Sequence, residues 1–131
     1  MSTESNLHTR QSLESRETQG LIGSDKVEGT AVYRSNGDKI GQIARVMIGK
    51  RSGKVGYAVM SFGGFLGIGE DYYPLPWSLL TYSPRLEGYE VNLSDAQLKG
   101  APKYGTHENW DWGSRARTID DYYKVPPSWT M

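Results

Sequence analysis

The sequence predicts an all-β (mainly) fold: a small antiparallel β-barrel of about six strands with short helical turns and an aromatic C-terminal extension. Three observations favour this fold class. Short apolar segments alternate with hairpin-type turns, long helical patterns are rare before residue 104, and aromatic residues gather after residue 103. We therefore expect a disordered segment at 1–20, a barrel domain at 21–103, and an extension at 104–131. The extension is expected to be partly helical and to pack on the barrel or on a second subunit.

The first strands are expected to form a meander with tight turns. Residues 27–34 have strand composition, and Asn36-Gly37 is a pair that favours a type I′ hairpin turn. Residues 40–48 form the next predicted strand. Residues 55–62 read Val-Gly-Tyr-Ala-Val-Met-Ser-Phe, with little polar face. This pattern predicts a strand near the centre of the sheet.

A glycine-rich loop follows the third predicted strand. Four glycines within seven residues allow positive φ values, whereas the large apolar residues between them are not typical of a flexible linker. The glycine order is not that of a dinucleotide or P-loop motif. We interpret the loop as a folded structural element or as a contact surface. Its candidate contact residues, with one nearby tryptophan, are Gly63, Gly64, Phe65, Leu66, Gly67, Ile68, Gly69, Glu70 and Trp77.

The remaining elements of the barrel carry local signals. Residues 72–77 contain two prolines, which lack a ladder donor, so an edge strand or strand end is expected. A helical turn at 78–80 precedes short strands at 81–82 and 89–93. Ser94 with Gln97 has the form of a capping box, and this helix should end at Gly100.

The C-terminal extension combines aromatic rings with charges. Pro126 and Pro127 should stop a helix after Lys124. A free tail of this composition would expose large apolar rings, so we expect it to fold back on the barrel or onto a second copy. The candidate tail contacts are Trp110, Trp112, Tyr122, Tyr123 and Trp129.

Composition narrows the function classes. The 15 basic and 15 acidic residues balance, so no overall field favours DNA or an anionic membrane. No apolar run approaches the roughly 20 residues of a membrane helix, and no secretory signal is visible. We therefore expect no membrane insertion and a cytoplasmic location.

The chemistry-bearing residues do not predict an enzyme. There is no cysteine, and the two histidines are His8 and His107. The adjacent acidic pairs, Glu70 with Asp71 and Asp120 with Asp121, are interpreted as solvated charges or turn ligands. No hydrolase or metal motif is present. The expectation is no catalytic residue, no metal and no cofactor.

Two alternative functions stay open. Lys50, Arg51 and Lys54, with Arg45 nearby, form the basic cluster of the sequence. Solvated turn residues are favoured over RNA contact, but an RNA- or ribosome-associated assembly factor remains an alternative hypothesis. A small-ligand-binding barrel is the other alternative, although convergent polar clusters are missing.

Several motifs resemble the PRC-barrel domain family, named for the cytoplasmic part of the photosynthetic reaction-centre H subunit. The resemblance covers about residues 21–102. It rests on strings at 27–33, 37–43, 52–59 and 98–102, and above all on Phe-Gly-Gly-Phe-Leu-Gly-Ile-Gly-Glu at 62–70 followed by Pro-Leu-Pro-Trp at 74–77. We expect neither the membrane helix of the H subunit nor the additional barrel of ribosome-maturation factors in this protein. It is most similar to standalone bacterial members.

The resemblance implies a non-enzymatic interaction or adaptor module. Such a module would self-associate as a homo-oligomer or bind a protein partner. The family offers no catalytic residues to transfer to this sequence.

Overall fold

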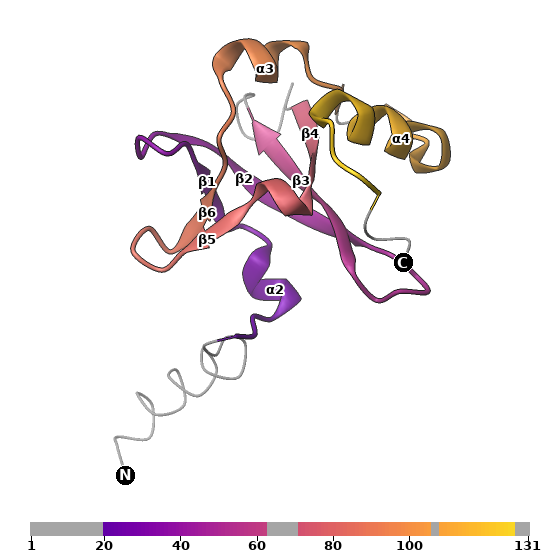
Figure 1. The fold of residues 1–131 in the computed structure, drawn as a ribbon. Helices are drawn as coiled ribbons and strands as arrows, with labels where there is room; N and C mark the ends of the chain where they lie inside the picture. Colours follow the sequence, from indigo (N-terminus) through magenta and orange to yellow (C-terminus); the bar gives the residue numbers. More distant parts are fainter. Residues whose placement is uncertain (1–19, 63–70, 106–107, 128–131) are drawn as a thin grey trace.

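A computed structural model describes residues 20–62, 71–105 and 108–127 of the chain. Within these residues, seven strands form one sheet, accompanied by three short α-helices and a 3₁₀ turn (Figure 1). In chain order the elements are α2 (Ser24–Val27), β1 (Ala31–Tyr33), β2 (Lys39–Ile48), β3 (Val55–Phe62), β4 (Asp71–Pro76), η1 (Trp77–Leu79), β5 (Thr81–Ser83), β6 (Gly88–Glu90), α3 (Asp95–Gly100), β7 (Tyr104–Gly105) and α4 (Trp112–Tyr123). The predicted disordered segment lies outside the described residues, apart from Gly20.

The sheet has the strand order β5-β6-β1-β2-β3-β4-β7. Within the described part of the chain, the end strands β5 and β7 do not pair, so the sheet is open and not a closed barrel. One neighbouring pair, β1 with β6, is parallel, whereas the others are antiparallel. The mainly β fold is thus confirmed, while the expectation of a wholly antiparallel sheet is wrong. Val32 of β1 pairs with Tyr89 of β6, and this long-range contact has no local sequence signal.

The segment predicted as a strand at 27–34 is divided in the structure. Val27 ends α2, and Gly29 takes a φ of +85° before β1 begins. The Thr30 hydroxyl donates to the Lys26 carbonyl at 2.6 Å, which holds this reversal in place. The strand predicted at 27–34 is therefore confirmed only for the three residues of β1.

The first turn differs from the predicted type I′ geometry. Gly37 has a φ of +95°, but Asn36 is not among the residues with positive φ, and type I′ needs both. The Asn36 side chain instead accepts a hydrogen bond from the Asp38 backbone N–H at 3.0 Å. This Asx-type bond gives the turn its local stability.

The proline-containing strand lies near the edge of the sheet, as its composition predicts. β4 pairs with β3 along its whole length, but with β7 only at Asp71 and Tyr72. Pro74 and Pro76 therefore lie where β3 is the paired neighbour, and their missing N–H groups break no ladder with β7. The predicted helical turn follows as η1, and the strand after it as β5.

The core lies between the central strands and the elements that cover them. Val32, Ile43, Met60 and Leu75 are fully buried, and residues from β6, α3 and the segment between them complete the cluster. Both hydrogen bonds of the predicted capping box of α3 are present. The Ser94 side chain accepts from the Gln97 backbone N–H, and the Gln97 side chain accepts from the Ser94 backbone N–H. In Figure 1, α3 and α4 lie at one end of the sheet and α2 at the other.

Candidate functional site

The predicted contact loop, residues 63–70, lies outside the described residues, as does Trp129. The remaining candidates are Trp77 in η1, Trp110 just before α4, and three aromatic residues of α4. The structure assigns no function to any of them directly. Their packing shows which surfaces they form.

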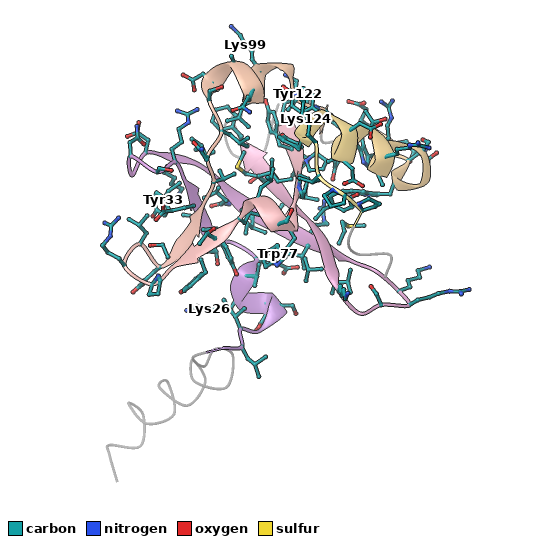
Figure 2. All side chains as sticks on the ribbon, viewed as in Figure 1. Lys26, Tyr33, Trp77, Lys99, Tyr122 and Lys124 are labelled. Atoms are coloured by element: carbon teal, nitrogen blue, oxygen red, sulfur yellow. The ribbon has the colours of Figure 1, made fainter. Side chains whose placement is uncertain are left out.

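Trp77 packs into the fold. Its ring lies 5.3 Å from that of Tyr89 in β6, and the half-buried side chain contacts the hydrophobic core. Figure 2 shows it beside the centre of the sheet. Much of its apolar surface is therefore used for stability, although part remains accessible.

The helix α4 has well-formed ends. The Asp111 carboxylate accepts a hydrogen bond from the Gly113 N–H at 3.0 Å, which caps the first turn. Lys124 adopts the left-handed conformation at φ 56°, and the next N–H, from Val125, donates to the Asp120 carbonyl. The chain therefore reverses at Lys124, before the two prolines that were expected to stop the helix.

α4 packs on the sheet through its apolar stripe. Ile119 is fully buried, and α4 contacts β4. At the end of the helix, the Tyr122 hydroxyl donates to the Gln97 carbonyl of α3 at 2.6 Å, and Figure 2 shows Tyr122 and Lys124 beside α3. The extension is thus attached to both the sheet and α3.

Tyr123, the neighbour of Tyr122, lies against the core. Burial raises the pKa of its phenol well above the ordinary value, and the nearby Tyr122 and Tyr73 phenols act in the same direction. The buried Tyr123 hydroxyl has no hydrogen-bond partner within the described residues. At neutral pH the group is a neutral phenol.

Five aromatic rings form a continuous line, which we call the aromatic seam. It joins β3, β4, β7 and α4 through ring-centroid distances between 4.7 and 6.2 Å. The shortest is the stacked pair Tyr104–Trp110 at 4.7 Å. The seam consists of Tyr57, Tyr72, Tyr104, Trp110 and Trp112.

Two arginines flank the aromatic seam. The Arg45 guanidinium lies 5.6 Å from the centroid of Tyr72 and donates to the Tyr104 hydroxyl at 3.2 Å. Arg115 lies 5.1 Å from the centroid of Trp110. Cation–π contacts of this kind contribute roughly 0.5–1 kcal/mol at exposed sites. Arg45 is therefore engaged with the seam and not with the basic cluster to which the sequence assigned it.

A buried polar pair joins the sheet to α4. The Tyr57 hydroxyl lies 2.8 Å from an Asp120 carboxyl oxygen and 3.3 Å from the Ala116 carbonyl oxygen. Asp120 is 7% exposed, so the interpretation of the Asp120–Asp121 pair as two solvated charges is wrong for Asp120. Burial raises the pKa of the Asp120 carboxyl, and the hydrogen bond from Tyr57 offsets part of this change.

Asp120→Asn is expected to stabilise the protein at neutral pH relative to the native chain. A raised pKa means that the folded state binds the Asp120 proton more tightly than the unfolded state does. The stability that this proton contributes is complete below the unfolded pKa, about 4, and is lost as the pH rises through the folded pKa. Asparagine keeps an acceptor for Tyr57 and carries no charge.

Melting temperatures of both proteins between about pH 3 and pH 7 check this prediction. The difference in favour of the variant should grow as the pH rises. Asp121, the exposed neighbour of Asp120, provides the control: Asp121→Asn should give a smaller change in melting temperature. A variant that loses stability at pH 7 would show that the ionised carboxylate is the stabilising form.

An apolar pocket of about 100 Å³ lies beside the Tyr57–Asp120 pair, between the β2–β3 hairpin and α4. Its volume is below the ~150 Å³ of an apolar cavity that holds one benzene molecule. At its border, the aliphatic side chain of Ile48 is 53% exposed. We call this feature the hairpin pocket; its lining residues are Met47, Ile48, Gly49, Gly56, Tyr57, Trp112 and Ala116.

The basic residues Lys50, Arg51 and Lys54 lie in the turn between β2 and β3, next to the hairpin pocket. All three are exposed. Among the described residues, no group of three or more metal-ligating side chains is found. The model also contains no helix, in the part of the chain it describes, with the length and apolarity needed to span a membrane.

The sequence did not predict the hairpin pocket, nor the part that Tyr57 and Tyr72 play in the five-ring aromatic seam. Tyr57 and Tyr72 were read only as strand residues, and Met47 and Ile48 as the apolar end of a strand. The one available signal was that 40–48 is apolar on both alternating faces. A strand of this kind has a second apolar surface that needs a cover, and α4 covers part of it.

The fold and its site define a small, mainly β domain extended by an aromatic helix. The chain belongs to the PRC-barrel domain family, whose family model matches residues 20–98, so the resemblance seen in the sequence is confirmed. The match ends before β7 and α4, so it does not include Trp110 or Trp112. A search of curated proteins finds no match to the chain.

Proposed function

We propose that this PRC-barrel protein is a non-enzymatic interaction module that binds a protein partner or a second copy of itself. The observation that carries the proposal is the hairpin pocket, an accessible apolar recess beside the exposed Ile48. Exposed apolar surface in a folded domain is typical of sites of protein association. The contact is expected to use this side of the molecule, where the family domain meets α4.

The polar groups near the pocket support binding over catalysis. The Tyr57 hydroxyl donates a hydrogen bond to the Asp120 carboxyl, and burial raises the pKa of that carboxyl. A pair engaged in this way joins two structural elements and presents no free base to a substrate. The small volume of the pocket also favours a single side chain over a cofactor-sized ligand.

Affinity capture and light scattering test the proposal together. The tagged full-length chain should either capture a protein from a lysate of its source cells or form a dimer in solution. Ile48→Glu, a change at an exposed position, should abolish that association. It should change the free energy of unfolding by less than about 0.5 kcal/mol. Leu21→Glu is the matched control, because Leu21 is an exposed aliphatic residue that precedes α2.

A monomer that captures no protein would overturn the proposal. Association that survives Ile48→Glu would keep the interaction function and move it to another surface. A catalysed reaction abolished by Asp120→Asn would overturn the non-enzymatic assignment.

A further inference from the structure

The hairpin pocket combines an apolar interior with a basic border. Its walls are aliphatic side chains, glycine backbone and the rings of Tyr57 and Trp112. The one hydroxyl on these side chains, that of Tyr57, is already bonded to Asp120 and Ala116. The indole N–H of Trp112 is the other polar side-chain group of the lining, so the interior offers mainly apolar contact.

The border of the pocket carries positively charged side chains. Lys50, Arg51 and Lys54 lie within five residues, directly between two pocket-lining glycines, Gly49 and Gly56. None of the three makes an ion pair with a described residue. On the α4 side of the pocket, the acidic residue next to Trp112 is Asp111. Its carboxylate accepts hydrogen bonds from the first turn of α4 and forms no ion pair with the three basic residues.

We propose that the hairpin pocket binds an acidic peptide segment of a partner protein. One aliphatic side chain of that segment enters the pocket, and its flanking carboxylates contact Lys50, Arg51 and Lys54. The inference rests on the proposed interaction function and specifies the surface and the chemistry of the partner. Charge complementarity selects an acidic partner, because positive side chains without internal partners raise the association rate of anionic ligands.

The pocket fits this occupant better than the other anionic macromolecules. A nucleic-acid base needs hydrogen-bond partners or an open ring face, whereas the pocket interior is apolar and Trp112 already contacts Tyr57 and Trp110. A membrane surface contacts protruding apolar groups, whereas the pocket is a recess between the hairpin and α4. A volume of about 100 Å³ accepts one side chain.

Selection of random short peptides displayed on phage against the full-length chain tests the inference. Enriched peptides should carry net negative charge and share one aliphatic residue. A synthetic copy of the enriched sequence is then titrated by fluorescence anisotropy at two salt concentrations. Affinity should fall at high salt, because the flanking charges are exposed.

Two variants examine the two parts of the surface. Ile48→Glu and the triple variant Lys50→Glu, Arg51→Glu, Lys54→Glu should each weaken peptide binding about tenfold or more. The matched control changes net charge equally at exposed positions that do not line the pocket: Lys39→Glu, Arg85→Glu, Lys99→Glu. The control should bind the peptide nearly as well as the native chain does. Melting curves of all variants verify that they fold.

Several results would overturn the inference. They are an enriched consensus without acidic residues, equal losses in both triple variants, or binding that Ile48→Glu leaves unchanged.

Other occupants of the surface are tested with polyuridylate and with vesicles of phosphatidylcholine and phosphatidylglycerol in equal parts. If one of these binds through Lys50, Arg51 and Lys54 and no peptide binds, the surface is assigned to RNA or lipid. Peptide binding seen only after deletion of residues 128–131 would assign the pocket to the chain's own C-terminus. If a captured partner persists in Ile48→Glu, the proposed function stands and this inference fails.

Discussion

Gly41→Val is expected to lower the free energy of unfolding by about 3 kcal/mol or more. Gly41 lies in β2, where a Cβ atom would stand 2.5 Å from the Ser61 carbonyl oxygen and 2.8 Å from the Met60 Cγ. Both neighbours belong to the central strand β3, and the closer one is backbone, which cannot rotate away. The variant must separate two paired strands or distort the core around Met60. Denaturant unfolding followed by circular dichroism measures the loss.

Gly20→Val is the matched control for this prediction. A Cβ atom at Gly20 would meet nothing within 4 Å, so the same change should alter stability by less than about 0.5 kcal/mol. Because small domains are stable by only about 5–15 kcal/mol, the loss at Gly41 is a large fraction of the total. Equal unfolding midpoints for the two variants would contradict the close packing of β2 on β3.

The elements predicted best from the sequence are those specified by neighbouring residues. The capping box of Ser94 and Gln97 depends on backbone groups three residues apart, and the structure contains it. The two prolines of β4 likewise exclude central pairing through their own chemistry. These signals need no knowledge of the rest of the fold.

The features that sequence reasoning missed depend on residues far apart in the chain. The parallel pairing of β1 with β6 joins Val32 to Tyr89, and nothing near either residue indicates it. Asp120 resembles any helical carboxylate until Tyr57 is placed 2.8 Å away. The hairpin pocket requires β2, β3 and α4 together. Local patterns predict elements, whereas burial and pockets follow from how the elements meet.

Ile119→Ala is expected to lower the free energy of unfolding by about 2–5 kcal/mol. Ile119 is fully buried, and truncation would leave a cavity between α4 and the sheet. This residue lies outside the segment that matches the PRC-barrel family, which ends at residue 98. The prediction therefore tests whether α4 is part of the same cooperative unit as the family domain. Thermal unfolding is followed both by far-ultraviolet circular dichroism and by tryptophan fluorescence.

Coincident transitions at a lower temperature would show that the sheet and α4 unfold together. This result is expected, because the Tyr57–Asp120 and Tyr122–Gln97 hydrogen bonds tie α4 to two parts of the domain. Thr118→Ala, at the exposed neighbouring position, is the control and should change stability by less than about 0.5 kcal/mol. If fluorescence of the α4 region changes early while the sheet transition stays in place, α4 is a separately unfolding attachment. The hairpin pocket, one wall of which is α4, would then exist only while that helix is docked.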